Sequence, residues 1–160
     1  MEDVVKALGL LCLGTRMKRL GERLQSQTQA IVDAVASDIS AGQYPLLGAI
    51  DRLGPLTIGE LAEALGVSQP GTTRTVNQLV ALGYLEVKPS AGDQRRKVVD
   101  LSAKGRALVD ISKTEVWPKV ESAVTDLCRG LEGPLLEQLA AIEDGLEAES
   151  LSSRSRKTKP

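Results

Sequence analysis

The chain has 160 residues, of which 42% are hydrophobic and 26% charged, with a formal net charge of -1. A chain of this length buries roughly two thirds of its unfolded surface, which suits one compact domain with appendages. It has no His, no Phe and two Cys, so we expect no metal site, no cofactor, no disulfide framework and no aromatic platform for single-stranded bases. No apolar run is long enough to span a membrane, and we expect a cytoplasmic protein.

The N-terminal part predicts a long helical segment from about Val4 to Ala36, which contains no proline. Apolar side chains recur roughly along one side of this segment, at Leu8, Leu13, Met17, Leu20, Leu24, Ile31 and Val35. The segment is too long to be covered by the rest of a small domain. We therefore expect part of its apolar side to need a further partner.

A second helix is predicted after Ser40, with Gln43 in capping-box position. Pro45 follows closely, which leaves open that the helix begins near Tyr44 instead. Its apolar residues are Leu46, Leu47, Ile50 and Leu53, and it ends at Gly54.

Two short helices joined by a tight turn come next. Thr57 and Glu60 form a T-x-x-E capping box ahead of a helix whose apolar residues have helical spacing, at Ile58, Leu61, Ala62 and Leu65. Gly66 ends this helix, and Ser68 caps another that runs to about Leu82. This arrangement is typical of a helix-turn-helix, which presents its second helix to the major groove of duplex DNA.

A strand, a basic loop and a returning strand are predicted over residues 84–87, 88–96 and 97–101. Between residues 66 and 106 the chain has seven basic and three acidic side chains, about +4 within a chain of net charge -1. A local basic surface neutralises phosphates and releases counterions, so this segment favours nucleic acid as a partner.

The C-terminal part predicts two more helices. Ser102 caps the first, which carries Leu108, Ile111, Trp117, Val120, Val124, Leu127 and Leu131, and Pro118 is expected to bend it. The second starts at Pro134 and carries Leu135, Leu139, Ile142 and Leu146. Such terminal apolar stripes are best satisfied by each other and by a second subunit. Residues 150–160 are small, polar and basic, and we expect them to be disordered.

The helix-turn-helix is followed by a D-x-R wing, Asp93 and Arg95, and by an L-[ST]-x-x-G exit that ends at Gly105. In this order and spacing, the run LTIGELAEALGVSQPGTTRTVNQLVALGYLEVKPSAGDQRRKVVDLSAKG resembles the winged-helix core of MarR-type transcriptional regulators, over about a third of the chain. The resemblance implies a mainly α fold with a small β-wing, in which a winged helix-turn-helix is flanked by N- and C-terminal dimerisation helices. We accordingly assign residues 1–37 to an N-terminal dimerisation helix, 38–105 to the DNA-binding domain, 106–149 to C-terminal dimerisation helices and 150–160 to a disordered basic tail.

The second helix of the helix-turn-helix supplies most of the expected DNA contacts: Ser68, Gln69, Pro70, Thr73, Arg74 and Asn77. Arg74 and Asn77 suit bidentate contacts to guanine and adenine, and Thr73 suits a phosphate or a thymine methyl group. The alternative is a solvated helix face. Thr72 and Thr75 stand where the family has larger apolar residues, which implies looser packing behind the helix.

The wing supplies the other expected DNA contacts: Lys88, Arg95, Arg96 and Lys97. We expect Asp93 to orient Arg95 through an ion pair, while Arg95 or Arg96 enters the minor groove, where the negative potential favours a guanidinium. The alternative is an exposed basic loop.

The resemblance implies a homodimeric repressor that binds a pseudo-palindromic operator and is released by a small molecule. The pocket would lie between the dimer helices and the winged helix, at Leu13, Met17, Leu46, Ile50 and Leu108. An alternative is a peroxide sensor, because one branch of the family uses a cysteine in its first helix, where Cys12 lies, and sometimes a second one late in the chain, as Cys128 is. No Arg, Lys or His lies within three residues of Cys12, and a free buried cysteine usually acts as a small hydrophobe.

The sequence contains no catalytic constellation, since it has no His base, no G-x-S-x-G motif and no Walker loop. We therefore expect a protein that is not an enzyme. Two alternatives stay open: the regulatory half of a larger MarR–acetyltransferase fusion, and a winged helix used for protein contact. The second alternative predicts a wing without arginines, whereas this wing contains Arg95 and Arg96.

Overall fold

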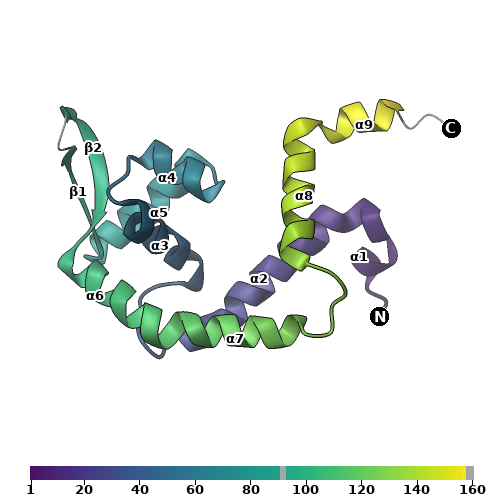
Figure 1. Cartoon of the computed structure of the whole chain (residues 1–160), viewed down its shortest axis with the longest axis horizontal. Helices are drawn as coiled ribbons and strands as arrows, with labels where there is room; N and C mark the ends of the chain where they lie inside the picture. Colours follow the sequence, from purple (N-terminus) through teal and green to yellow (C-terminus); the bar gives the residue numbers. More distant parts are fainter. Residues whose placement is uncertain (91–92, 158–160) are drawn as a thin grey trace. The chain divides into compact units, whose positions relative to one another are not determined.

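The structure, a computed structural model, describes residues 1–90 and 93–157, and of these the side chains of residues 93, 94, 155 and 157 are not described. The chain divides into two compact units, Met1–Glu121 and Ser122–Pro160. Most described residues are helical, and their sheet is a two-stranded antiparallel hairpin (Figure 1). The predicted fold class, mainly α with a small β-wing, is confirmed.

The elements follow one another as α1 (Val4–Ala7), η1 (Gly9–Cys12), α2 (Leu13–Val32), η2 (Ala41–Gln43), α3 (Tyr44–Leu53), α4 (Ile58–Leu65), α5 (Gln69–Ala81), β1 (Leu85–Ser90), β2 (Asp93–Leu101), α6 (Ala103–Ile111), the π-helical turn η3 (Ser112–Val116), α7 (Trp117–Cys128), α8 (Leu135–Ala148) and α9 (Leu151–Lys157). Helices α4 and α5 are the predicted helix-turn-helix. The hairpin of β1 and β2 is the predicted wing.

The N-terminal segment differs from the single long helix that the sequence predicts. It is broken into α1, η1 and α2, and α2 ends at Val32 rather than near Ala36. The break follows from Gly9, whose φ of +56° lies in the left-handed region and cannot continue a right-handed helix. Apolar periodicity indicated the helical character of this segment but not its interruption.

The predicted helix caps are present. Ser40 and Gln43 form a capping box, and α3 begins at Tyr44, the alternative start. Thr57 and Glu60 form the capping box of α4. At the start of α5 the N–H of Gly71 donates to the hydroxyl of its cap, Ser68, at 3.4 Å. These contacts satisfy backbone donors that the first turn of a helix leaves without partners.

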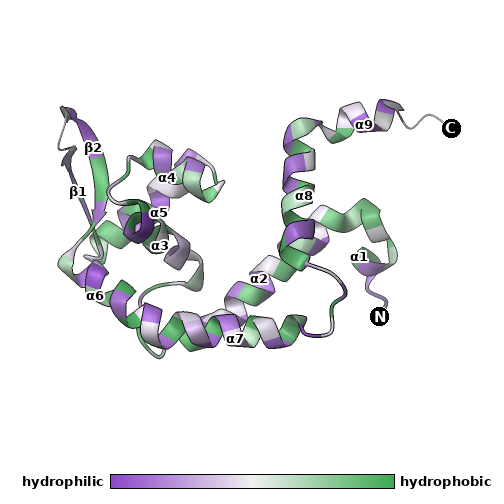
Figure 2. Ribbon diagram, viewed as in Figure 1, coloured by the Kyte–Doolittle hydropathy of each residue, from purple (hydrophilic) through white to green (hydrophobic). Residues whose placement is uncertain are grey.

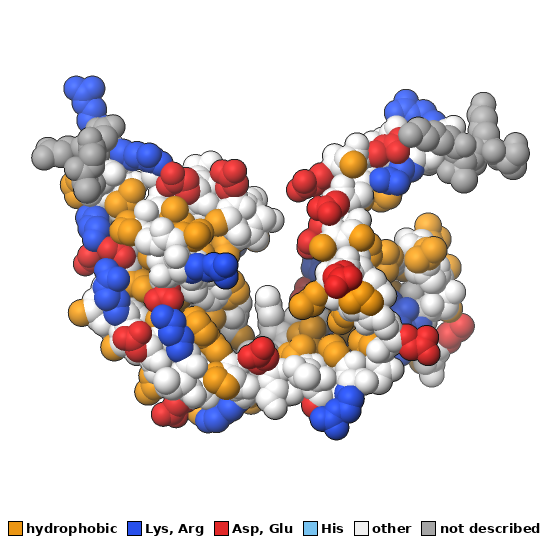
Figure 3. Space-filling view, in the orientation of Figure 1, with side chains coloured by type: hydrophobic (Ala, Val, Ile, Leu, Met, Phe, Trp, Pro, Cys, Tyr) orange, Lys and Arg blue, Asp and Glu red, His pale blue; other side chains and the backbone are white. Residues whose placement is uncertain are grey.

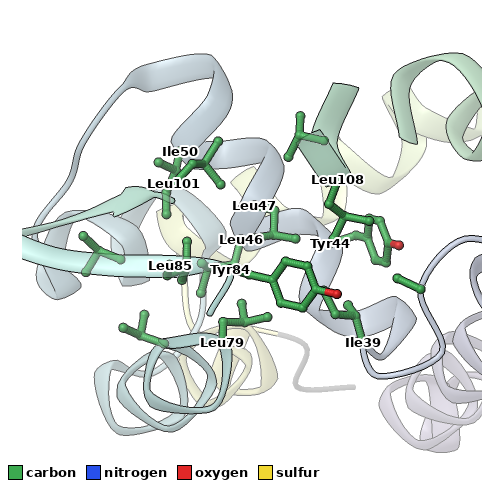
Figure 4. Close-up of a cluster of buried hydrophobic side chains, with 14 of the residues drawn as sticks. Ile39, Tyr44, Leu46, Leu47, Ile50, Leu79, Tyr84, Leu85, Leu101 and Leu108 are labelled. Atoms are coloured by element: carbon green, nitrogen blue, oxygen red, sulfur yellow. The ribbon is translucent and has the colours of Figure 1, made fainter. Parts of the chain in front are cut away.

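One hydrophobic core holds the first unit together (Figure 4). Leu47, Leu61 and Leu79, from α3, α4 and α5, have no exposed surface. Strand and α6 residues complete this core, with Leu85, Leu101 and Leu108 all buried. Since the helix-turn-helix and the wing share one core, they are held as a rigid pair.

The strands of the wing are longer than predicted. Leu85 pairs with Leu101, and the ladder continues through Pro89 opposite Lys97 to Ser90 opposite Asp93, with a bulge between Pro89 and Ser90. The loop predicted for residues 88–96 is therefore wrong in extent, because polar residues in an exposed hairpin have the composition of a loop. Only residues 91 and 92, which lie outside the described part, separate the two strands.

Gly105 lies where α6 crosses the start of the wing. A Cβ atom at this position would overlap the carbonyl oxygen of Tyr84 and approach its carbonyl carbon to 3.1 Å. The glycine of the exit motif is thus required by a close backbone approach.

The second unit lacks a core of its own: none of the side chains described in residues 122–156 is buried. Polar and apolar residues alternate in bands along α8 (Figure 2). Within the tail that is expected to be disordered, residues 151–157 form α9, whose Arg154 donates to the carbonyl oxygens of Gly145 at 2.6 Å and Glu149 at 3.1 Å. The prediction for residues 158–160 lies outside the described residues. Such contacts with the last carbonyls of α8 favour order that tail composition does not indicate.

Candidate nucleic-acid interface

Helix α5 turns a polar face to solvent and an apolar face to the core. Thr72, Val76 and Leu79 are buried, at 2%, 1% and 0% exposure. Of the six side chains expected to contact DNA, Thr73 is half-buried and the others are exposed: Ser68, Gln69, Pro70, Arg74 and Asn77. The structure brings all six to the solvent side of one helix, as a recognition helix requires.

The threonine hydroxyls of α5 are engaged with its own backbone. Thr73 Oγ1 donates to the carbonyl oxygen of Gln69 at 2.9 Å, and Thr72 and Thr75 donate to carbonyls four residues earlier at 3.2 Å each. Because its proton is used in this way, the Thr73 hydroxyl keeps only its acceptor capacity, and the side chain also carries a methyl group. This favours the contact with a thymine methyl over donation to a phosphate.

Gln78 lies on the same helix and was not singled out by the sequence. It is exposed, and its Oε1 accepts a hydrogen bond from Gln43 Nε2 at 3.2 Å. The contact links α5 to η2. The sequence contains one signal for Gln78: it follows Arg74 by four residues, and this spacing puts the two side chains on the same side of a helix.

The returning strand of the wing presents three cations. Arg95, Arg96 and Lys97 are all exposed on β2, and Lys and Arg side chains lie along the wing side of the first unit (Figure 3). The predicted ion pair between Asp93 and Arg95 falls on a side chain outside the described residues. Arg96 forms an ion pair with Glu60, across from the wing on α4.

Lys88 has a different setting from the other wing cations. Its ammonium contacts Asp100, and it lies 3.8 Å from Glu86. Asp100 also accepts from Arg106 at 3.1 Å and from its neighbouring Leu101 N–H at 2.7 Å. These contacts give Lys88 a place in the base of the wing, where it neutralises a buried carboxylate.

The environment of Asp100 keeps it ionised. Burial raises the pKa of this carboxyl, but the hydrogen bonds from Lys88 and Leu101 and the charge of Arg106 outweigh burial and lower the pKa below its ordinary value. The carboxylate is therefore the fixed anion that holds Lys88 and Arg106.

The expected effector pocket is not assembled as predicted. Leu46, Ile50 and Leu108 are buried within the core, whereas Leu13 and Met17 are half-buried on α2, outside that cluster. A cavity of about 430 Å³ lies instead beside α5. It is lined by Gln25, Gly42, Pro45, Leu46, Leu65, Val67, Gly71, Thr72, Arg74 and Thr75.

This cavity coincides with the two threonines that suggested loose packing. Thr72 and Thr75 line it from α5, and Arg74 is the cation in its lining. The cavity therefore lies between α5, the helix expected to read DNA, and residues of α2, η2 and α3.

The described residues contain no cluster of His, Cys, Asp and Glu suited to a metal ion. No described helix is both long and apolar enough to cross a membrane. Cys12 and Cys128 are half-buried free thiols.

The sequence and the fold both match known proteins. Residues 37–96 match the MarR family. The chain is similar to the solved structure of the transcriptional repressor CouR bound to a 23-mer DNA duplex, with 27% identity and a TM-score of 0.68, over 82% of this chain and 92% of that chain. It is also similar to a variant of MarR from E. coli complexed with operator DNA, with 22% identity and a TM-score of 0.67, over 92% and 98% of the two chains.

A third similar structure is the transcriptional regulator BldR from Sulfolobus solfataricus, with 19% identity and a TM-score of 0.63, over 93% of this chain and 100% of that chain. Together these matches confirm the winged-helix fold that the motifs predicted.

Proposed function

We propose that this chain, whose residues 37–96 match the MarR family, is a sequence-specific, double-stranded DNA-binding transcriptional regulator that acts as a homodimeric repressor. One observation carries the proposal: the exposed polar face of α5 and the exposed cations of β2 are held by a single core. Helix α5 would enter the major groove, and the wing would reach the adjacent minor groove.

Selection of bound fragments from genomic DNA tests this function. We expect enrichment of one pseudo-palindromic sequence, with tighter binding than to unrelated duplex at the same salt concentration. Equal recovery of all fragments would leave only non-specific binding and contradict the proposal.

The homodimer is supported by apolar side chains that the chain leaves uncovered. Leu10 and Leu11 of η1 are 87% and 82% exposed, and Leu136 of α8 is 79% exposed. Apolar surface of this extent marks an association site. Light scattering at micromolar concentration should give roughly twice the chain mass of 17.0 kDa; a mass equal to that of one chain would contradict the dimer.

We further propose that a small effector controls DNA binding from the cavity beside α5. Its lining is apolar at Leu46, Leu65 and Val67 and includes the cation Arg74, a combination that suits a hydrophobic or aromatic anion. Such a ligand would contact the recognition helix directly. Because coupling is reciprocal, a true effector must bind less tightly when operator is present; equal affinity with and without DNA would exclude the compound tested.

A further inference from the structure

Glu60 contacts the wing as well as its own helix cap. Its Oε2 accepts hydrogen bonds from the N–H and the hydroxyl of Thr57, both at 2.8 Å. Its other oxygen, Oε1, accepts from Arg96 Nη2. One carboxylate therefore joins the first helix of the helix-turn-helix to a cation expected to meet DNA.

The backbone fixes this juxtaposition. Leu56, just before the cap of α4, exchanges two backbone hydrogen bonds with Val99 of β2: its N–H donates to the Val99 oxygen at 3.1 Å, and the Val99 N–H donates back at 2.7 Å. The start of α4 is thus held beside the wing strand. Glu60 lies in the first turn of α4 and Arg96 lies three residues before Val99 on β2, so neither side chain depends on a flexible loop.

Both partners remain open to solvent, with 52% of the Arg96 side chain and 41% of the Glu60 side chain exposed. The Thr57 hydrogen bonds, together with Arg96, lower the pKa of Glu60, so that it is ionised at neutral pH. An exposed pair of this kind is weak enough to exchange partners. A phosphate that approached the wing would meet an arginine already neutralised.

We propose that Glu60 competes with DNA phosphates for Arg96 and thereby lowers the affinity of the protein for unrelated DNA. This inference rests on the proposed function. On unrelated duplex a phosphate must displace Glu60 to reach Arg96, and while the Glu60–Arg96 pair is intact no counterion is released at this position. Glu60 is then a positioning residue that lowers non-specific affinity through Arg96 without touching DNA.

The test measures the binding of a random-sequence duplex of about 30 base pairs as a function of salt. Glu60→Gln should bind it about 3- to 10-fold more tightly, with a log K against log salt slope steeper by about 0.9, the value for one added phosphate contact. The amide oxygen of Gln can still accept from Thr57, as Gln43 accepts from the N–H of Ser40 in this same chain. The helix cap is therefore retained, which thermal melting checks.

Two further variants separate the ion pair from general charge effects. Arg96→Gln alone should change the slope of log K against log salt by much less than 0.9, the value for one phosphate contact. Glu60→Gln combined with Arg96→Gln should return the slope to that of the parent. Glu63→Gln is the matched control, because Glu63 is an exposed acid on the same helix. It should raise affinity less than Glu60→Gln does.

An unchanged slope of log K against log salt in Glu60→Gln would overturn the inference. A slope shallower by about 0.9 in Arg96→Gln alone, which is the loss of one phosphate contact, would overturn it as well. These results differ from a failure of the proposed function. If the parent protein binds no duplex, the function itself is wrong; if it binds but Glu60→Gln behaves as the parent does, only the competition is wrong.

Discussion

The two compact units of this protein bury their apolar residues differently. In the first unit, residues from α3, α4, α5, the wing and α6 close a common core around Leu47, Leu61 and Leu79. In the second unit, the apolar stripe of α8 follows helical spacing just as regularly, yet Leu135, Ile142 and Leu146 are 37%, 39% and 51% exposed. Periodicity alone thus does not make a core. Exposed apolar stripes of this kind are typical of surfaces through which proteins associate.

The largest effect should come from breaking the first unit at its closest backbone approach. We expect Gly105→Ala to lower the free energy of unfolding by about 4 kcal/mol or more, because the added Cβ meets the backbone of Tyr84, which cannot move independently of the core. Gly130→Ala is the control in the second unit, where a Cβ would meet no atom within 4 Å. Urea denaturation of both variants checks this; equal stability of the two would contradict the rigid junction.

A slightly smaller effect should distinguish a core leucine from an interface leucine. Leu61→Ala should cost about 3 kcal/mol in unfolding free energy, since Leu61 has no exposed surface. Leu136→Ala should instead weaken self-association, because its side chain is 79% exposed. Melting as a function of protein concentration, with light scattering, separates the two. A concentration-independent monomer for both proteins would show that the second unit is not an interface.

Two substitutions in the first unit should separate base reading from phosphate binding. Asn77→Ala should cost about 1–3 kcal/mol on the selected operator and leave non-specific affinity nearly unchanged. Arg95→Ala should weaken binding to operator and unrelated duplex alike, with a log K against log salt slope shallower by about one. Titrations at several salt concentrations measure both. If neither change affects operator binding, α5 and the wing do not contact DNA as proposed.

The smallest effect concerns the loss of melting temperature at low pH, to which we expect Asp100 of the first unit to contribute. Since the pKa of Asp100 is lowered on folding, its contribution is complete above the ordinary value of 3.8 and is lost as the pH falls through the lower folded pKa. The parent should therefore lose melting temperature on acidification more steeply than Asp100→Asn does. Asp126→Asn in the second unit removes only an exposed pair with Arg129 and should follow the parent. Identical acid profiles for the parent and Asp100→Asn would refute this role.

The sequence by itself determined the order of the helices and strands, because that order depends on interactions between residues close together in the chain. The caps at Thr57, Ser68 and Ser102 all depend on contacts three residues apart, and the sequence predicts them correctly. The polar face of α5 is likewise determined by helical spacing. The break at Gly9 was missed even though its cause is local, because a glycine inside an apolar pattern does not reveal its φ.

Only the tertiary structure decided which partners the charged and apolar side chains take. Lys88 meets Asp100 across 12 residues and Arg96 meets Glu60 across 36, and no local pattern encodes either choice. The cavity beside α5 also arises where separate elements meet, so its lining could not be read from a single stripe. Long-range pairing depends on how complete elements pack, whereas caps and periodicity are set by the geometry of one helix or strand.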